Sequence, residues 1–351
     1  MRGSGAGPCP ALAAYDAAPH LWTRTAPRGI LSILVGMLAE MVRQVAAECG
    51  FELAGVASAE PLPADIAKYD AWCEAGYAGE MRYLTDRRRF VRHDPKELLP
   101  TARSILCVGK LYNTGEVEQD SSHAQIARYA RGLDYHDTMR ADLKRMLARL
   151  HELAPEPFDA KICIDTAPLL ERSYARMAGL GWIGKNTSLI NQQQGSWFLL
   201  GEIVTSLEID PATPPPDRCG TCTRCIDACP TDAIVPVPPG NGNEWTIDSR
   251  LCISYLTIEL HGEIPAELHA GIGDNLFGCD ICQEVCPWND PERIPVTTDE
   301  SFDREPLRLS ELAEMDEARF RERFGKTPVS RAKFSGLKRN LGVVLENLRR
   351  A

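Results

Sequence analysis

Eight of the thirteen cysteines fall into two compact groups, and their spacing is the strongest chemical signal in the chain. The first group has the pattern CxxCxxCxxxCP, which is the ligand spacing of bacterial ferredoxins. The second has the pattern CxxCxxxCP, and a lone cysteine upstream can supply the ligand that it lacks. The groups are Cys219, Cys222, Cys225 and Cys229, and Cys252, Cys279, Cys282 and Cys286. The array predicts two [4Fe–4S] clusters and therefore electron transfer.

The spacing also predicts which thiolates share a cluster. Three thiolates separated by two residues can surround one cluster, whereas the fourth, followed by proline, points away from it. Each fourth cysteine should therefore bind the other cluster. Cluster one is assigned Cys219, Cys222, Cys225 and Cys286, and cluster two is assigned Cys229, Cys252, Cys279 and Cys282. Two zinc sites are the alternative that CxxC pairs alone would allow, but the two CP steps and the crossed pattern favour clusters.

The rest of the composition is that of an intracellular redox protein. The chain has 351 residues, lacks an apolar run long enough to span a membrane, and opens without an export signal. We therefore expect a cytoplasmic monomer whose cysteines serve metal or redox chemistry rather than disulfides. A net charge of −10 argues against a general nucleic-acid coat. Two basic segments, 82–93 and 319–340, still leave room for a local phosphate-binding surface.

The elements that must position these groups follow from hydrophobic periodicity. A helical pattern begins near Ile30 and is closed by Gly50, and a second, amphipathic helix covers 136–153. Strands are predicted at 51–57, 104–112, 160–168 and 196–209. Because strands and helices alternate, we predict an α/β (α+β) domain followed by a ferredoxin-like domain. The expected boundaries are a disordered leader at 1–29, the first domain at 30–208, the cluster domain at 209–295, and a basic tail at 296–351.

An electron relay needs a terminus, so the first domain should hold a second cofactor. The sequence contains neither a dinucleotide-binding G-x-G-x-x-G motif nor a P-loop. The segment 134–139, DYHDTM, comes close to the D-x-H-x-x-G signature that supplies a histidine to cobalt in some cobalamin proteins. It fails at Met139, where glycine is required.

Several segments carry a resemblance to a known family. They are GYAGEMRYL (76–84), ARYARGLDYH (127–136), DTAPLLERSYARMAGLGWIGKNT (165–187), CISYLTIE (252–259) and GCDICQEVCPWN (278–289). With the cysteine array, they resemble the epoxyqueuosine reductases over most of residues 38–345. Two departures stand out, namely about seven extra residues around 236–243 and an inserted-looking Lys326 in the tail.

The resemblance implies a function and its cofactors. The family binds cobalamin without a protein histidine on cobalt, and reduces epoxyqueuosine in tRNA to queuosine. By that likeness, an external low-potential donor feeds cluster one, cluster two and then cobalamin. Low-valent cobalamin opens the epoxide, Asp165 protonates the departing oxygen, and water leaves in a two-electron deoxygenation. Such an acid needs a raised pKa, which burial would provide.

The resemblance also implies binding residues, several of which have plainer explanations. For cobalamin they are Arg92, Asp165, Leu189, Asn191, Leu200 and Ser254, and for the substrate Arg172, Lys338 and Arg339. Arg92 could be a solvated arginine, and the two leucines could be core residues. Asp165 lies at the end of a predicted strand, where α/β domains place ligands, but it could equally cap the following helix. Asp134 and His136 are either structural or at the border of the pocket.

Two other functions compete with this one. A reductive dehalogenase shares the cobalamin and two clusters, but a twin-arginine export signal is missing and basic patches are present. A cluster-bearing electron carrier without its own substrate would need only the array, whereas some two hundred residues precede it.

Overall fold

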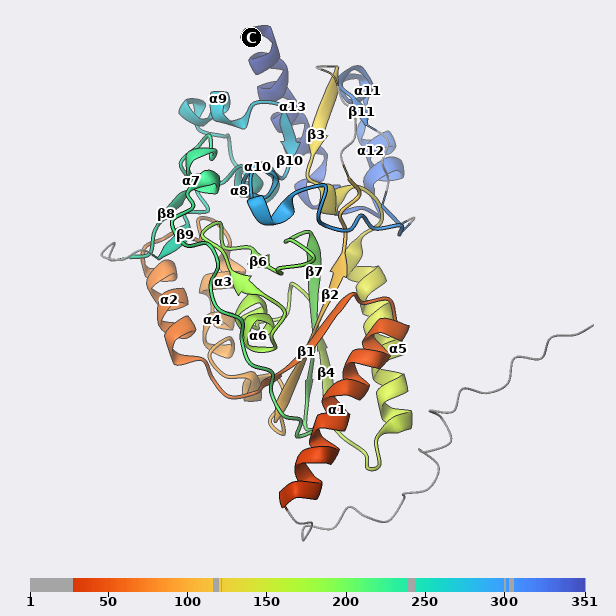
Figure 1. Cartoon of the computed structure of the whole chain (residues 1–351). Helices are drawn as coiled ribbons and strands as arrows, with labels where there is room; N and C mark the ends of the chain where they lie inside the picture. The colour runs from red at the N-terminus through yellow and green to blue at the C-terminus, as the bar shows by residue number, and fades with distance from the viewer. Residues whose placement is uncertain are drawn as a thin grey trace, which may run out of the picture.

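The computed structural model describes residues 28–115, 120, 122–238, 244–299, 301–302 and 306–350, with side chains from Met37 onward. The predicted leader lies almost wholly outside the described residues, which begin with helix α1 (Arg28–Glu48). Within them, no helix is both long and apolar enough to cross a membrane. The chain forms a lower body around one sheet and an upper body that contains the cysteine array and the C-terminal helices (Figure 1).

The lower body is built on a four-stranded sheet whose strands are those that the sequence predicts. In spatial order the strands are β1 (Leu53–Ser58), β2 (Ser104–Leu111), β7 (Phe198–Thr205) and β4 (Ala160–Cys163). Every neighbouring pair is antiparallel. The mixed class predicted from the sequence is therefore realised as α+β, because strands that alternate with helices in sequence need not pair in parallel.

Helices cover both faces of this sheet, and the two-residue period of the strands decides what each face buries. In β2, Leu106 and Val108 pack with α1 and α5 (Tyr135–Leu153), whereas Ile105 and Cys107 pack on the opposite face with α6 (Glu171–Met177). Helix α1 ends where predicted, since Gly50 adopts φ +87°, a left-handed conformation that favours glycine.

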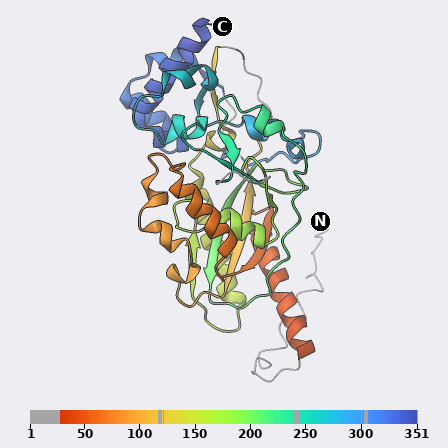
Figure 2. The ribbon, with the colours of Figure 1, turned by 90° about the vertical axis from the view of Figure 1, so that its left-hand side faces the viewer.

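Short elements complete the side of the lower body that carries α6. Helices α2, α3 and α4 stand beside it, and a small hairpin of β5 and β6 follows it (Figure 2). Their bounds are α2 Pro63–Glu74, α3 Arg82–Thr85, α4 Arg88–Val91, the 3-10 turn Pro95–Glu97, β5 Trp182–Ile183 and β6 Leu189–Ile190.

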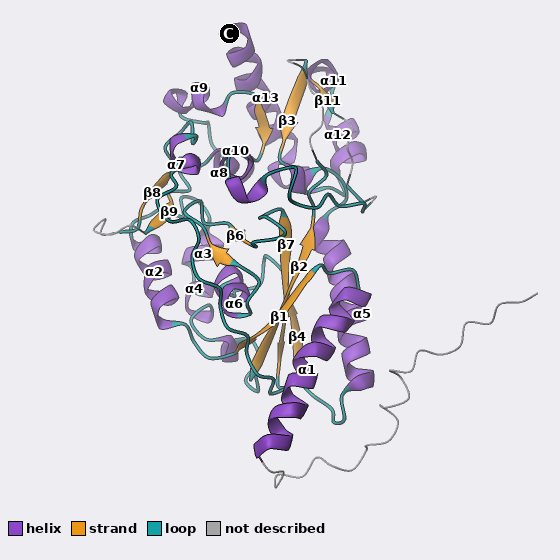
Figure 3. Ribbon diagram, in the orientation of Figure 1, coloured by secondary structure: helices purple, strands orange, loops and turns teal. Residues whose placement is uncertain are grey.

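The cysteine array lies in a loop-rich segment of the upper body (Figure 3). Its elements are α7 Arg224–Asp227, β8 Ile234–Pro236, β9 Trp245–Ile247, α8 Ile253–Ile258, the turn Ala266–Leu268, α9 His269–Ile272, β10 Asn275–Phe277, α10 Ile281–Glu284 and the turn Pro287–Asn289. The antiparallel pair β8 and β9 flanks the lengthened loop around 236–243, of which residues 239–243 lie outside the described part.

The C-terminal segment is a folded part of the upper body rather than an appended tail. It comprises β11 Leu307–Arg308, α11 Leu309–Glu314, α12 Glu317–Phe324, the turn Pro328–Ala332 and α13 Lys333–Arg350. Its apolar residues share a core with β3 (His123–Ile126), which pairs with both β10 and β11. The boundary predicted at residue 208 is therefore not respected in space, because β3 and the following turn Arg128–Ala130 belong to the upper body.

Candidate functional site

Asp165 follows strand β4 but is not a helix cap. Its backbone adopts φ 43°, and α6 begins only at Glu171, after Leu170. The helix-cap interpretation of Asp165 is therefore wrong. Parallel sheets bind ligands at the carboxyl ends of their strands, but that expectation does not apply to Asp165 either, since this sheet is antiparallel. The Asp165 side chain is 42% exposed, which leaves its carboxylate accessible.

One histidine connects Asp165 to a second aspartate. Nε2 of His136 lies 3.0 Å from Oδ2 of Asp165, and Nδ1 lies 2.7 Å from Oδ1 of Asp134. Asp134 is the N-cap of α5 and also accepts the His136 backbone N–H, which fixes both residues. Burial alone would lower the pKa of His136, but hydrogen bonds to Asp165 and Asp134 outweigh it and raise the pKa. Protonated imidazole can donate to both carboxylates at once.

The expected raised pKa of Asp165 is not found. Burial pushes this pKa upward, yet the hydrogen bond from His136 and the positive charges of His136, Arg331 and Arg172 hold it below the ordinary value. The reason is that cationic partners favour the ionised carboxylate more strongly than desolvation opposes it. Of the two groups, His136 therefore holds a proton more readily than Asp165 does.

Arg331 brings the C-terminal segment into the same centre. Its Nη1 lies 3.7 Å from Oδ2 of Asp165, and its Nε lies 2.8 Å from Oε1 of Glu259, just after α8. Its Nη2 lies 3.4 Å from the hydroxyl of Tyr83, whose pKa burial raises to about 12. A residue expected only in a basic tail thus contacts the candidate catalytic carboxylate.

Two buried glutamates lie behind Asp165. The carboxylate of Glu171 accepts the Asp165 backbone N–H, and burial, with the Asp165 charge, raises its pKa to about 8. Glu202 of β7 is 0% exposed, and neither carboxylate oxygen has a hydrogen-bond partner within the described structure. Burial and the charge of Glu171 raise its pKa well above the ordinary range. No pattern in the sequence indicates this pair, because both residues are ordinary glutamates until the sheet and α6 enclose them.

Arg92, one of the residues expected to bind the cofactor, lies near Glu171 behind Asp165. Arg92 is only 4% exposed, and its Nη1 donates to the carbonyls of Tyr83 and Arg88. It is also close enough to Glu171 to lower the pKa of that carboxyl. Arg92 is therefore a buried arginine beside the Asp165 centre rather than a solvated one.

The remaining predicted cofactor residues have structural contacts of their own. Leu189 and Leu200 belong to the core that α6 covers. The Asn191 amide donates to the Leu180 carbonyl and accepts from the N–H groups of Gln193 and Gln194. Ser254 donates backbone and hydroxyl hydrogen bonds to the Cys252 thiol.

The predicted substrate residues divide into one near Asp165 and two far along the chain. Nη1 of Arg172 donates to the Thr187 carbonyl at 2.6 Å and to its hydroxyl at 3.1 Å. Lys338 donates to the carbonyls of Leu312 and Ala313 at the end of α11. Arg339 donates to the carbonyls of Leu256, Leu260 and Gly262 around the end of α8. Lys338 and Arg339 thus stabilise two helix ends, which is a structural alternative to contact with tRNA.

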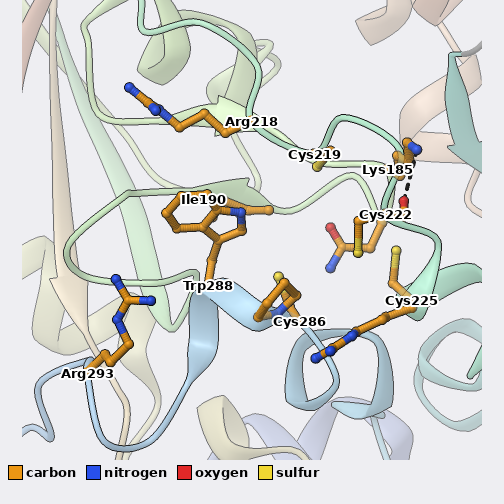
Figure 4. Close-up of a pocket in the computed structure, with 12 residues that line it drawn as sticks. Lys185, Ile190, Arg218, Cys219, Cys222, Cys225, Cys286, Trp288 and Arg293 are labelled. Atoms are coloured by element: carbon orange, nitrogen blue, oxygen red, sulfur yellow. Dashed lines mark hydrogen bonds between the residues drawn. The ribbon is translucent and has the colours of Figure 1, made fainter.

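Four cysteines drawn from both motifs lie around one pocket. A pocket of about 250 Å³ is lined by Cys219, Cys222, Cys225 and Cys286 (Figure 4). Burial raises the pKa of the Cys286 thiol, and the neighbouring Cys219 and Cys222 contribute.

The other four cysteines lie together in the same way. Burial raises the pKa of the Cys279 thiol to about 12, with contributions from nearby Cys252 and Cys229. The Cys282 thiol is close to both Cys279 and Cys252. Across the described residues, no three His, Cys, Asp or Glu side chains are placed to hold a single metal ion.

Two family models match the chain. Residues 218–289 match the 4Fe-4S double cluster binding domain, and residues 92–166 match the family described as epoxyqueuosine reductase QueG, DUF1730. The first match decides between the two interpretations of the cysteines in favour of iron–sulfur clusters.

Full-length relatives extend the likeness. An epoxyqueuosine reductase of Leadbetterella byssophila is 39% identical over 306 residues, which are 87% of this chain and 97% of the relative. One of Xanthomonas campestris pv. campestris is 39% identical over 320 residues, 88% of this chain and 86% of the relative.

Solved structures show the same fold. An epoxyqueuosine reductase with a tRNA-Tyr epoxyqueuosine-modified tRNA stem loop superposes with a TM-score of 0.80 at 29% identity. The alignment covers 90% of this chain and 83% of that one. The enzyme from Streptococcus thermophilus gives 0.76 at 30% identity, covering 88% and 81%. A reductive dehalogenase reaches only 0.47 at 15% identity, which is too distant to bear on activity.

Proposed function

The chain belongs to the epoxyqueuosine reductase family, and we infer that it reduces epoxyqueuosine in tRNA to queuosine. The observation that carries this conclusion is 39% identity over almost the whole length of an epoxyqueuosine reductase. The site agrees with it, because an accessible carboxylate with a proton held beside it lies in the same molecule as a two-cluster array. In the net reaction the epoxide takes up two electrons and two protons, the C–O bonds break, and an alkene and water result.

The eight cysteines fit two [4Fe–4S] clusters. We propose that Cys219, Cys222, Cys225 and Cys286 bind cluster one, since these four line one pocket. Cys229, Cys252, Cys279 and Cys282 are assigned to cluster two. Cys225 is near enough to Cys282 to help raise the pKa of that thiol, so the two groups lie close together, as a relay requires.

Cobalamin is the proposed second cofactor, and His136 provides the test of fit. Both ring nitrogens of His136 are occupied by carboxylates, so this histidine is not available to bind cobalt. The failed D-x-H-x-x-G motif therefore fits a cobalamin that takes no ligand from that position. By the resemblance, Leu189, Leu200, Arg92, Asn191 and Ser254 are the further residues that we propose to hold it. When bound, cobalamin supplies the electrons that open the epoxide.

The residues of this chain handle the proton. Asp165 is the carboxylate that can give a proton to the departing oxygen, but it is ionised at rest. His136 holds the proton 3.0 Å away and transfers it to Asp165 as negative charge develops on the substrate oxygen. Asp134 orients the imidazole through Nδ1 and stabilises its positive charge. Arg331 and Arg172 provide further positive charge near Asp165.

The partners follow from this chemistry. The substrate is tRNA, and we propose Arg172, Lys338 and Arg339 as contacts to it. We further propose that an external low-potential donor delivers electrons at cluster one, and that the protein works as a monomer in the cytoplasm.

Nucleoside analysis of tRNA tests the proposed function directly. A strain that lacks this gene should accumulate epoxyqueuosine and lose queuosine, and the wild-type gene should restore it. Anaerobic protein loaded with clusters and cobalamin should convert epoxyqueuosine in tRNA under a chemical reductant. Normal queuosine in the deletion strain, with no other reductase present, would refute the proposal.

A further inference from the structure

Three arginines line the pocket of cluster one, and their guanidinium groups have no partner among the described residues. Arg218, Arg224 and Arg293 line the same pocket as the four cysteines, and Figure 4 labels Arg218 and Arg293 there. All three side chains are exposed. Within the described part of the chain, none of their guanidinium groups makes an ion pair or a hydrogen bond. Lys185, the fourth cation, is occupied, since its Nζ donates to the carbonyls of Gly220 and Cys222. These three arginines are called the arginine rim below.

An apolar surface lies inside the rim. Trp288 is half-buried against Trp182 with ring centroids 5.0 Å apart, and Pro287 beside it is exposed. Two further hollows, of about 280 Å³ and 780 Å³, share Pro287 and Arg293 with the cluster-one pocket. The surface is therefore concave, with an apolar centre and a charged edge, as transient protein interfaces are.

The acids of the larger hollow have partners. Asp227 accepts the Thr223 hydroxyl at 2.7 Å, and Glu284 lies 3.6 Å from Arg128. Asp290 accepts the Glu292 backbone N–H. These hydrogen bonds leave the carboxylates charged, but the cluster-one pocket itself is lined, among the described residues, by four cations and no acid, although the whole chain carries −10.

Cluster one is also the cluster that an outside protein can approach. Cys252 and Cys279 of cluster two pack against an apolar core, whereas no cysteine of cluster one joins such a core among the described residues. Helix α8 carries Cys252 at one end and Glu259 at the other, and Glu259 holds Arg331 beside Asp165. Helix α8 thus links cluster two to the acid centre, which leaves cluster one as the end of the relay open to a donor.

We propose that the arginine rim is the docking site of a strongly acidic, low-potential electron-carrier protein of the flavodoxin type. This inference rests on the proposed function, and it gives the external donor a chemical class. The carrier's reduced flavin gives one electron to cluster one, so the flavin is oxidised by one electron and the cluster is reduced by one. Opposite charge steers the encounter, and the apolar centre admits close approach. A tRNA phosphate could also bind arginine, but no residue of the Asp165 centre lines this pocket.

Charge reversal of the rim tests the proposal. The variant Arg218→Glu/Arg224→Glu/Arg293→Glu is compared with Arg140→Glu/Lys144→Glu/Arg149→Glu, which makes the same charge change on exposed positions of α5. Cluster-loaded protein is mixed with flavodoxin hydroquinone, and cluster bleaching is followed without tRNA. We expect the second-order rate of the rim variant to fall at least about tenfold at low salt and to lose most of its salt dependence. The α5 variant should stay within about twofold of the wild type.

Two further measurements and a replacement variant make the result decisive. Oxidised flavodoxin should bind the rim variant at least about tenfold more weakly, which is a readout independent of turnover. Photoreduced deazaflavin, a small uncharged reductant, should reduce both variants at the wild-type rate. If the Glu variant loads less iron, the corresponding Arg→Gln triple variant replaces it.

Two results would count against the docking proposal. Equal flavodoxin rates and affinities in the two variants would overturn the proposal. Lost tRNA affinity with unchanged cluster reduction would assign the rim to RNA instead. Because these assays contain no epoxyqueuosine, a failure to convert that nucleoside would refute the proposed function and leave the rim result standing.

Discussion

The two functional regions of this molecule are assembled in opposite ways. The cluster ligands lie mostly within two short segments, and their spacing alone predicts which of them share a cluster. The Asp165 centre draws Tyr83, His136, Asp165, Glu259 and Arg331 from five distant parts of the chain. A soft-metal site needs identical ligands at fixed spacing, whereas a proton donor needs different charges at defined distances. The first requirement is met by local sequence, and the second is met only by tertiary packing.

The largest effect should come from breaking the crossed ligation of the clusters. Cys286→Ser should remove cluster one although Cys286 lies in the second motif, and Cys229→Ser should remove cluster two. Each variant should drop from about eight irons to about four and lose epoxide reduction. Iron content with electron paramagnetic resonance identifies the missing cluster. Damage confined to the cluster of each residue's own motif would contradict the assignment.

Replacement of Asp165 should leave the relay intact and stop proton delivery. Asp165→Asn should lower single-turnover reduction by roughly a hundredfold or more, with both clusters retained, because a general acid has about that effect. Asparagine tolerates the left-handed backbone at this position, where φ is 43°.

Asp165→Ala is the matched control for strain. It should be equally inactive and also less stable by about 1 kcal/mol, since alanine is disfavoured in that conformation. Thermal melting separates the two variants. An Asn variant that reduces the epoxide at a near-normal rate would remove Asp165 from the mechanism.

Replacing His136, which holds the proton beside Asp165, should have a smaller effect on the rate and should change its pH dependence. The pKa of His136 is raised, so the wild-type rate should be full below that pKa and decline as pH rises through it, above the ordinary 6.5. His136→Gln should lower the rate by about tenfold, less than loss of the acid itself. The alkaline decline should vanish in this variant. A pH–rate profile that keeps the decline would assign it to another group.

The smallest effect concerns the residues at the two helix ends. Arg339→Ala should lower the free energy of unfolding by about 2 kcal/mol, because a charged donor to three carbonyls is lost. Lys338→Ala should lower it by about 1 kcal/mol. Melting temperature and tRNA affinity are measured on each variant. Unchanged melting with weakened, less salt-dependent tRNA binding would show that the two residues serve the substrate.

Several features could be predicted from the sequence because they depend on neighbours in the chain. The cysteine spacing indicated the crossed groups, and two-residue and helical periodicities indicated β1, β2, β4, β7 and α5. Gly50 marked the end of α1, since few residues other than glycine adopt φ +87°. The resemblance identified Asp165, although the sequence alone could not separate an acid from a helix cap.

Tertiary structure decided what depends on distance and burial. Only packing places Arg331 3.7 Å from Asp165 and His136 3.0 Å from the same carboxylate. These two groups lower the pKa of Asp165, which burial alone would have raised. Only the antiparallel pairing of β7 encloses Glu202, and only the shared core draws β3 and the supposed tail into the upper body. Spacing along a chain fixes which side chains are available, but the electrostatic state of each one is set by groups that the fold brings to it.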